Sequence, residues 1–139
     1  MSETTEQAIV RIVLSHYAAV QGVYLFGTYG TEYERPESDV DIALLLPPEQ
    51  AKKEGDLSLT QCRADLEKAL HRDVDLLNLR LASTVFQKEI ISSAVLLHCA
   101  DRYAVDEFEM LVLSFYQKLN EERADVLAEG LDSGRFYDV

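Results

Sequence analysis

The sequence is poor in positive charge. Its 13 Lys and Arg residues stand against 25 Asp and Glu residues, which gives a formal net charge of −12 at pH 7. Proteins that bind nucleic acids contact the phosphate backbone through Lys and Arg, so this balance argues against direct binding of DNA or RNA. The same negative charge favours a basic protein partner. A bound nucleotide is still compatible with it if a divalent metal ion supplies the positive charge.

Cysteines and long apolar runs are also scarce. The two cysteines, Cys62 and Cys99, lack the spacing of metal ligands and are expected to be reduced, largely buried thiols of a cytoplasmic protein. The N-terminal segment 1–17 carries acidic residues where a signal peptide needs basic ones. No apolar run is long enough to span a membrane. The sequence therefore predicts neither export nor membrane anchoring.

The apolar pattern predicts an α/β fold, and 139 residues suffice for one folded domain. Four segments show helical spacing, and four short β-branched or aliphatic runs between turn residues indicate buried strands. The expected helices cover residues 6–20, 58–71, 83–92 and 102–129, and the expected strands cover residues 23–26, 40–46, 74–79 and 94–99. This order predicts a small mixed β-sheet covered by helices, with a long C-terminal helix.

Single residues set several expected boundaries. Gly22 is expected to end the first helix. Ser58 is expected to cap the second, which would place Leu59 on the inner face of that helix. The charged segment 47–58, which begins with two prolines, is expected to be a solvated surface connection.

The last boundary lies near the C-terminus. Gly130 is expected to end the long helix, because glycine commonly follows the last helical residue. Residues 1–129 then form a single domain, and residues 130–139 form a tail. The apolar and aromatic residues of this tail have no obvious core to join, so we interpret it as a candidate surface for a partner protein.

Two carboxylates open the second expected strand. Asp39 and Asp41 are two residues apart and point to the same face, while Val40 and Ile42 point into the core. Carboxylates held about 7 Å apart repel each other unless a cation lies between them. Such oxygen ligands suit Mg²⁺, which takes its remaining ligands from water and phosphate. The pair therefore predicts metal-dependent chemistry at a phosphorus atom.

This chemistry needs a third carboxylate from a neighbouring strand. Asp73 and Asp75 open the third expected strand and share a face, so their spacing alone does not choose between them. Asp75 is favoured because it lies inside the strand, where packing would fix its rotamer. Asp73 lies at the start of the strand and remains the alternative third acid.

The turn after the first strand completes the candidate site. Gly27 lets the backbone approach a ligand closely, and the N–H and hydroxyl groups of Thr28 can donate hydrogen bonds to phosphate oxygens. The expected loop 29–38 then returns the chain, so that the second strand lies beside the first. A phosphate cradle and metal ligands thereby meet at one edge of the sheet.

With these residues, the segment GTYGTEYERPESDVD resembles the signature of the polymerase-β-like nucleotidyltransferases. That signature is Gly-Ser, here Gly27-Thr28, followed by ten residues and Asp-x-Asp, here Asp39 and Asp41. The third acid of the family falls in a short apolar strand, which matches VDLLNL and implies Asp75. The chain length and the closing helix resemble the minimal nucleotidyltransferases, which are typically the antitoxin partners of HEPN ribonuclease toxins.

The resemblance implies an enzyme that uses ATP and Mg²⁺ to transfer AMP to a tyrosine hydroxyl of a HEPN toxin, which silences the toxin. Asp39, Asp41 and Asp75 would be the metal-binding and catalytic acids, with Asp75 helping to activate the acceptor hydroxyl. Gly27 and Thr28 would hold the triphosphate. Two alternatives stay open: the same fold could neutralise a toxin by covering its active site, or it could nucleotidylate a small molecule.

Overall fold

The computed structural model describes residues 3–27 and 39–133, with side chains described up to residue 124. Ten elements follow one another along the chain: α1 (Thr5–His16), β1 (Gly22–Phe26), β2 (Val40–Leu45), α2 (Pro48–Glu54), α3 (Gln61–Leu70), β3 (Val74–Asn78), the 3₁₀ turn η1 (Leu79–Leu81), α4 (Thr84–Ser93), β4 (Val95–Cys99) and α5 (Arg102–Ser133). None of the helices in the described ranges is long and apolar enough to cross a membrane.

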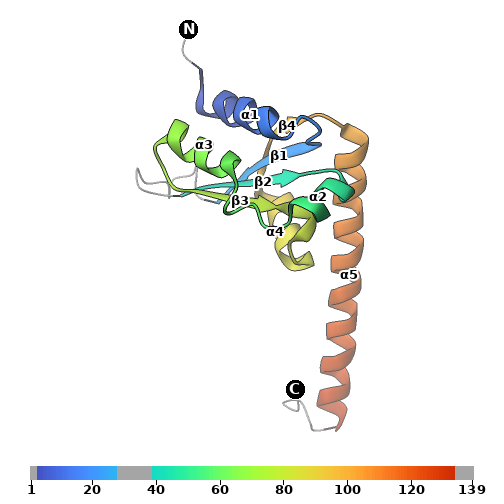
Figure 1. Cartoon of the computed structure of the whole chain (residues 1–139). Helices are drawn as coiled ribbons and strands as arrows, with labels where there is room; N and C mark the ends of the chain where they lie inside the picture. Colours follow the sequence, from blue (N-terminus) through green and yellow to red (C-terminus); the bar gives the residue numbers. More distant parts are fainter. Residues whose placement is uncertain (1–2, 28–38, 134–139) are drawn as a thin grey trace.

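The four strands form one mixed sheet in the order β3-β2-β1-β4. β1 is antiparallel to both β2 and β4, whereas β2 and β3 run parallel. Figure 1 shows α1 and α3 over one face of this sheet and α4 on the other, with α5 running past its end. The predicted α/β fold with a small mixed sheet is therefore confirmed.

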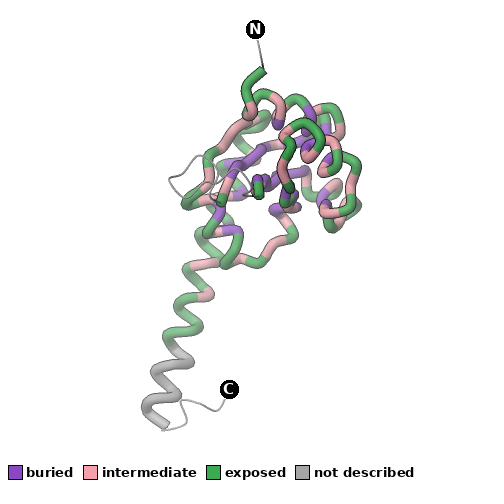
Figure 2. Tube along the Cα trace, turned by 90° about the vertical axis from the view of Figure 1, so that its left-hand side faces the viewer, coloured by how far each residue is buried: buried purple, intermediate pink, exposed green. Residues whose placement is uncertain are grey.

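A hydrophobic core lies on each face of the sheet, because alternate strand residues point to opposite sides. Ile42 joins the core under α1 and α3, and its neighbour Ala43 joins the core under α4 and α5. Both residues are fully buried. Figure 2 shows the buried residues gathered in the sheet and its packed helices. β2 thus lies at the centre of the molecule, and residues at its start take their position from both cores.

Helix α5 begins on the sheet and continues past it. Val105, Phe108 and Val112 are buried in the core, whereas residues 120–124 are exposed. Figure 1 shows the helix projecting away from the rest of the chain. Gly130 lies inside α5, so the expectation that it ends the helix is wrong. A glycine in an exposed helix costs about 1 kcal/mol relative to alanine, which a long helix tolerates.

The segment expected to be a surface connection contains helix α2, and that expectation is wrong. Pro48 occupies the start of α2, where its missing N–H breaks no helical hydrogen bond. Ala51 is buried against the core, and Gly55 follows the helix with a φ of 62°. The helix has only seven residues, too few for an apolar period to reveal it among so many charges.

Two expected helix boundaries are also wrong. α1 ends at His16, and Gly22 instead begins β1, where it pairs with residues of two neighbouring strands. Thr60 rather than Ser58 caps α3, because the Thr60 hydroxyl accepts a main-chain N–H of the first turn. Leu59 therefore lies outside the helix and is 95% exposed instead of facing the core.

Candidate active site

The predicted carboxylates lie on two adjacent strands. Asp41 of β2 lies opposite Asp75 of β3 in the parallel register, and Asp39 directly precedes β2. Val40 and Ile42 are fully buried in the core under α1 and α3, on the face of β2 opposite to Asp41, as predicted. Asp39 and Asp75 are exposed, whereas Asp41 is partly buried. The strand register alone therefore brings acids from distant parts of the sequence together.

The register distinguishes the two candidates for the third acid. Asp75 lies inside β3 beside Asp41, while Asp73 precedes the strand and its carbonyl oxygen accepts a hydrogen bond from Val40 N at 2.9 Å. Both side chains line an open groove of about 420 Å³, together with Asp39. Asp75 thus lies in the groove with Asp39 and Asp73 and is also paired with Asp41, and its role as the third acid stays a prediction.

The two neighbouring acids perturb Asp41. The pKa of Asp41 is raised to about 6, first by burial and then by the negative charges of Asp75 and Asp39. A bound cation between these carboxylates would remove the repulsion and favour the ionised form of Asp41. Perturbed carboxyl groups of this kind are typical of functional sites.

Gly27 packs against the central acid. Its φ is +80°, and a Cβ atom built on it would overlap Oδ2 of Asp41. Only glycine fits here without strain, because the positive φ disfavours any side chain and a Cβ atom would force the Asp41 carboxylate to move. Gly27 thus closely approaches the Asp41 carboxylate, and its predicted approach to a ligand stays a prediction. Thr28 and the expected loop 29–38 lie outside the described residues.

The carboxylates have the chemistry of a magnesium site but do not form a complete cage. Among residues 3–27 and 39–133, no group of three or more His, Cys, Asp and Glu side chains is arranged to hold a metal ion. Mg²⁺ in nucleotide sites is commonly bound through one or two carboxylates, with water and substrate phosphates as the other ligands. Asp39 and Asp41 fit that requirement by residue type and by their place at the start of β2, where Asp39 directly precedes the strand.

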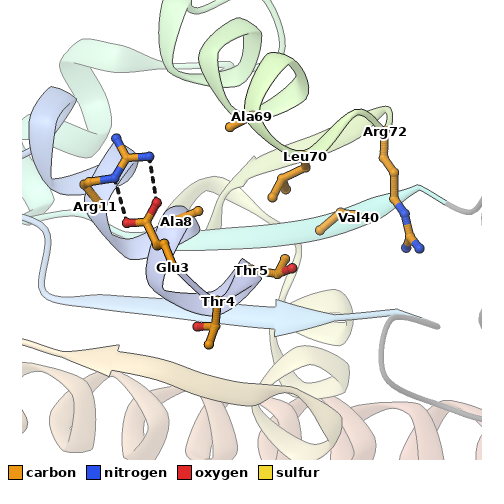
Figure 3. Close-up of a pocket in the computed structure, with 9 residues that line it drawn as sticks. All are labelled: Glu3, Thr4, Thr5, Ala8, Arg11, Val40, Ala69, Leu70 and Arg72. Carbon is orange, nitrogen blue, oxygen red and sulfur yellow. Dashed lines mark hydrogen bonds and ion pairs between the residues drawn. The ribbon is translucent and has the colours of Figure 1, made fainter. Parts of the chain in front are cut away.

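A second cavity lies on the other side of the start of β2. It measures about 480 Å³ and is lined by residues of α1, the end of α3 and Val40. Figure 3 shows Arg11 paired with Glu3 at its wall, with distances of 2.7 and 3.0 Å from Nε and Nη2 to the carboxylate oxygens. None of the three carboxylates of the candidate site lines this cavity. The groove, which Asp39 and Asp75 line, is therefore the better candidate site.

An aromatic pair lies beside the acids and was not predicted. Phe26 of β1 is opposite Asp41 in the antiparallel register, and its ring meets that of Phe86 edge to face with centroids 5.9 Å apart. Phe86 belongs to α4 and is 41% exposed. No local pattern indicates this contact, because the two residues are far apart in the chain.

Arg63 is a further residue that sequence reasoning missed. It lines the groove with the acids and forms an ion pair with Glu67, one turn later in α3, at 3.2 Å. The i, i+4 spacing of opposite charges signals such a pair on a helix. That spacing does not reveal that the pair faces a strand carrying a candidate catalytic acid.

Sequence comparison identifies a family and a curated relative. The family described as "Polymerase beta, Nucleotidyltransferase" matches residues 8–103. Over 128 residues the chain is 30% identical to the protein adenylyltransferase MntA of Shewanella oneidensis. That alignment covers 91% of this chain and 88% of the relative.

Solved structures of similar fold extend the comparison. One, described as a toxin-antitoxin crystal structure with AMP-PNP, has a TM-score of 0.70 and 27% identity, and the match covers 92% of this chain and 99% of that chain. Another is described as a tri-AMPylated Shewanella oneidensis HEPN toxin in complex with MNT antitoxin. It has a TM-score of 0.66 and 27% identity, covering 91% of this chain and 96% of that one. The similarity extends over nearly the whole chain in both sequence and structure.

Proposed function

The chain belongs to the polymerase beta nucleotidyltransferase family and is a nucleotidyltransferase, and from this premise we propose that it transfers AMP from ATP to a tyrosine hydroxyl of a HEPN-type toxin. By this reaction it acts as the antitoxin of that protein. The names of its relatives, a protein adenylyltransferase and an antitoxin bound to an AMPylated toxin, support the proposal. The observation that carries it is the pairing of Asp41 with Asp75 beside Asp39.

The reaction is an in-line displacement at the α-phosphorus of ATP. The tyrosine oxygen forms a new bond to this phosphorus, and the bond from phosphorus to the bridging oxygen of the β-phosphate breaks. Pyrophosphate leaves, and the phenolic proton is transferred to a carboxylate. Asp75 is the proposed acceptor of this proton, because it is exposed in the groove and lies opposite Asp41.

Asp39 and Asp41, with Asp75 as the third acid, are the residues proposed to hold Mg²⁺. When bound, the ion would neutralise charge on the phosphate oxygens. Gly27 and Thr28 are proposed to hold the triphosphate. The chain itself contributes a rigid arrangement, since Asp41 is fixed between two paired strands and under the backbone of Gly27.

The partner is proposed to present a basic or complementary surface in the cytoplasm. The chain has a net charge of −12, which favours association with a positively charged protein. Residues 130–139 are proposed to contribute to that contact. Deleting residues 130–139 is expected to weaken capture of the toxin and to leave the melting temperature unchanged. Among the residues of α5 whose side chains are described, the last one buried in the core is Val112.

Label transfer from ATP tests the function. The protein is incubated with Mg²⁺, ATP labelled at the α-phosphate and a HEPN toxin from the same source. The double variant Asp39→Asn/Asp41→Asn is compared with Asp106→Asn, which removes an exposed carboxylate of α5. Label on the toxin is expected with the native protein and with Asp106→Asn, but not with the double variant. Mass spectrometry then identifies the modified residue.

Two other results would redirect the proposal. If no label is transferred and both the native protein and the double variant neutralise the toxin equally, the chain acts by covering the toxin. If label appears in a small-molecule fraction rather than on the toxin, the acceptor class is wrong although the transfer chemistry holds.

A further inference from the structure

β3 is an edge strand whose free side lies against α3. Among the strands of the described residues it pairs only with β2, so one side of its backbone has no neighbouring strand there. Val40 N donates to Asp73 O at 2.9 Å, which directs the main-chain groups of Asp73 toward β2. The main-chain N–H and C=O groups of successive residues point to opposite sides of a strand. The N–H and C=O groups of the next residue, Val74, therefore point away from β2. An unpaired edge at this position would be free to fray.

Two side chains of α3 bind both main-chain groups of Val74. Nε of Arg63 donates to Val74 O at 2.7 Å, and Val74 N donates to Oε2 of Glu67 at 3.0 Å. Arg63 and Glu67 also pair with each other at 3.2 Å, and Nη1 of Arg63 donates to Ser58 O at 2.9 Å. We call Arg63 and Glu67 the Val74 clamp. It gives the edge residue the hydrogen bonds that a further strand would otherwise supply.

The clamp acts one residue before a candidate catalytic acid. Asp75 follows Val74 directly and lies opposite Asp41, which it repels. That repulsion tends to separate β2 and β3 at the end of the sheet where the acids lie. If β3 were bonded only to β2, this repulsion could move its start away from β2. Because β3 is also bonded to α3, its register with β2 is maintained.

We propose that Arg63 and Glu67 are positioning residues that hold the start of β3 so that Asp75 stays opposite Asp41. The inference rests on the proposed AMP transfer, because Asp75 is assigned its role there. Neither clamp residue touches a reacting group in this scheme. Their effect on the reaction passes through the backbone of Val74.

A direct role of Arg63 in phosphate binding is the competing explanation, since Arg63 lines the groove. Its Nε, Nη1 and Nη2 atoms each donate to a protein oxygen, which fixes the guanidinium against β3 and the 58–60 turn. A phosphate ligand would have to compete with those bonds. The contacts therefore favour a positioning role.

Two measurements on the same variants test the clamp. Arg63→Ala removes it, Arg63→Lys keeps the charge but not the planar fork, and Glu67→Gln keeps an acceptor for Val74 N. Arg102→Ala is the matched control, because it breaks another exposed i, i+4 ion pair, at the start of α5 directly after β4, which is the edge strand opposite β3. Hydrogen exchange at the Val40 amide reports the pairing of β2 with β3, and the Gln21 amide, bonded to Leu45 O, reports the other end of β2.

For Arg63→Ala we expect kcat for AMP transfer to fall about ten- to hundred-fold, with KM for ATP nearly unchanged. Exchange at Val40 should become at least about ten-fold faster while exchange at Gln21 stays the same. Arg63→Lys and Glu67→Gln should show smaller changes in both quantities. Arg102→Ala should match the native protein.

Other outcomes would overturn the inference. Unchanged Val40 exchange in Arg63→Ala would show that the clamp does not hold the strand, and a raised KM for ATP in that variant would assign Arg63 to phosphate binding. If the native protein transfers no AMP at all, the proposed function fails. The exchange comparison would then still decide whether the clamp holds the two strands together.

Discussion

Asp41 and Asp75 lie directly opposite each other on the parallel strands β2 and β3. Each residue belongs to a strand whose neighbouring positions are buried in the core, so neither strand can slide without exposing apolar side chains. The folding of the sheet therefore fixes the separation of two acids that repel each other. The register of β2 and β3 therefore links the stability of the protein to the chemistry proposed for Asp41 and Asp75.

Replacing Asp41 by Asn is expected to stabilise the folded protein at pH 7.5 in the absence of Mg²⁺. The pKa of Asp41 is raised from its ordinary value of 3.8 to about 6 by burial and by the charges of Asp75 and Asp39. A raised carboxyl pKa favours folding at low pH, and this contribution is lost as the pH rises through that window. At pH 7.5 the charged form opposes folding, and the neutral amide introduced by Asp41→Asn would remove the charge.

Thermal melting of the two proteins from pH 4 to pH 8 measures this effect. The melting temperature of Asp41→Asn should exceed that of the native protein by a few degrees at pH 7.5, and the gap should shrink as the pH falls below about 6. Asp106→Asn controls for the loss of one exposed negative charge. A gap that does not change with pH would argue against a strained Asp41 carboxylate.

Magnesium with ATP is expected to stabilise the native protein through the same acids. A ligand that binds only the folded state raises the melting temperature, by an amount that grows with its concentration above Kd. The rise should appear with Mg²⁺ and ATP together, should be lost when EDTA is added, and should be absent in Asp39→Asn/Asp41→Asn. An equal rise in that double variant would place the nucleotide elsewhere on the molecule.

The third acid can be assigned by comparing Asp75→Asn with Asp73→Asn. Asp75 lies within the paired strand opposite Asp41, whereas Asp73 precedes it and contributes its main-chain oxygen to the sheet. AMP transfer should fall about hundred-fold or more in Asp75→Asn and change little in Asp73→Asn. Label transfer under single-turnover conditions measures both. The opposite ranking would assign the role to Asp73.

Much of the site was predictable because it depends on local sequence. The two-residue spacing of Asp39 and Asp41 in an apolar strand fixes their common face, and the buried Val40 and Ile42 bear this out. Its place inside the third strand favours Asp75, but the position of Asp75 opposite Asp41 depends on the register between two strands whose paired residues are more than thirty positions apart. Spacing within one strand cannot supply that information.

Other features were unpredictable because their cause is tertiary. Helix α2 is short and highly charged, and it is fixed in part by the burial of Ala51. The Val74 clamp forms because α3 lies along the free edge of β3. No sequence pattern within α3 indicates this packing. Helix α5 continues past Gly130 although glycine is a common helix terminator. In each case packing or helix context overrides a local signal.

Gly27→Ala tests whether the turn and the central acid depend on each other. Gly27 has a φ of +80°, and a methyl group there would overlap the Asp41 carboxylate. Gly55 also has a positive φ, 62°, but a Cβ atom on it would meet nothing within 4 Å. Gly55→Ala therefore measures backbone strain without a collision; at a φ of 62° and a ψ of −135° this strain is on the order of 1–3 kcal/mol.

Gly27→Ala is expected to lower the free energy of unfolding, because it adds a collision with the Asp41 carboxylate to the strain of a positive φ, whereas Gly55→Ala adds strain without a collision. Urea unfolding of both variants gives the two values. In the background of Asp41→Ala, which removes the carboxylate, the cost of Gly27→Ala should fall. The difference between the two backgrounds is then the coupling energy between turn and acid, expected to be about 1 kcal/mol or more. Equal costs in both backgrounds would mean that Gly27 is required only for its backbone conformation, and that its approach to Asp41 has no energetic role.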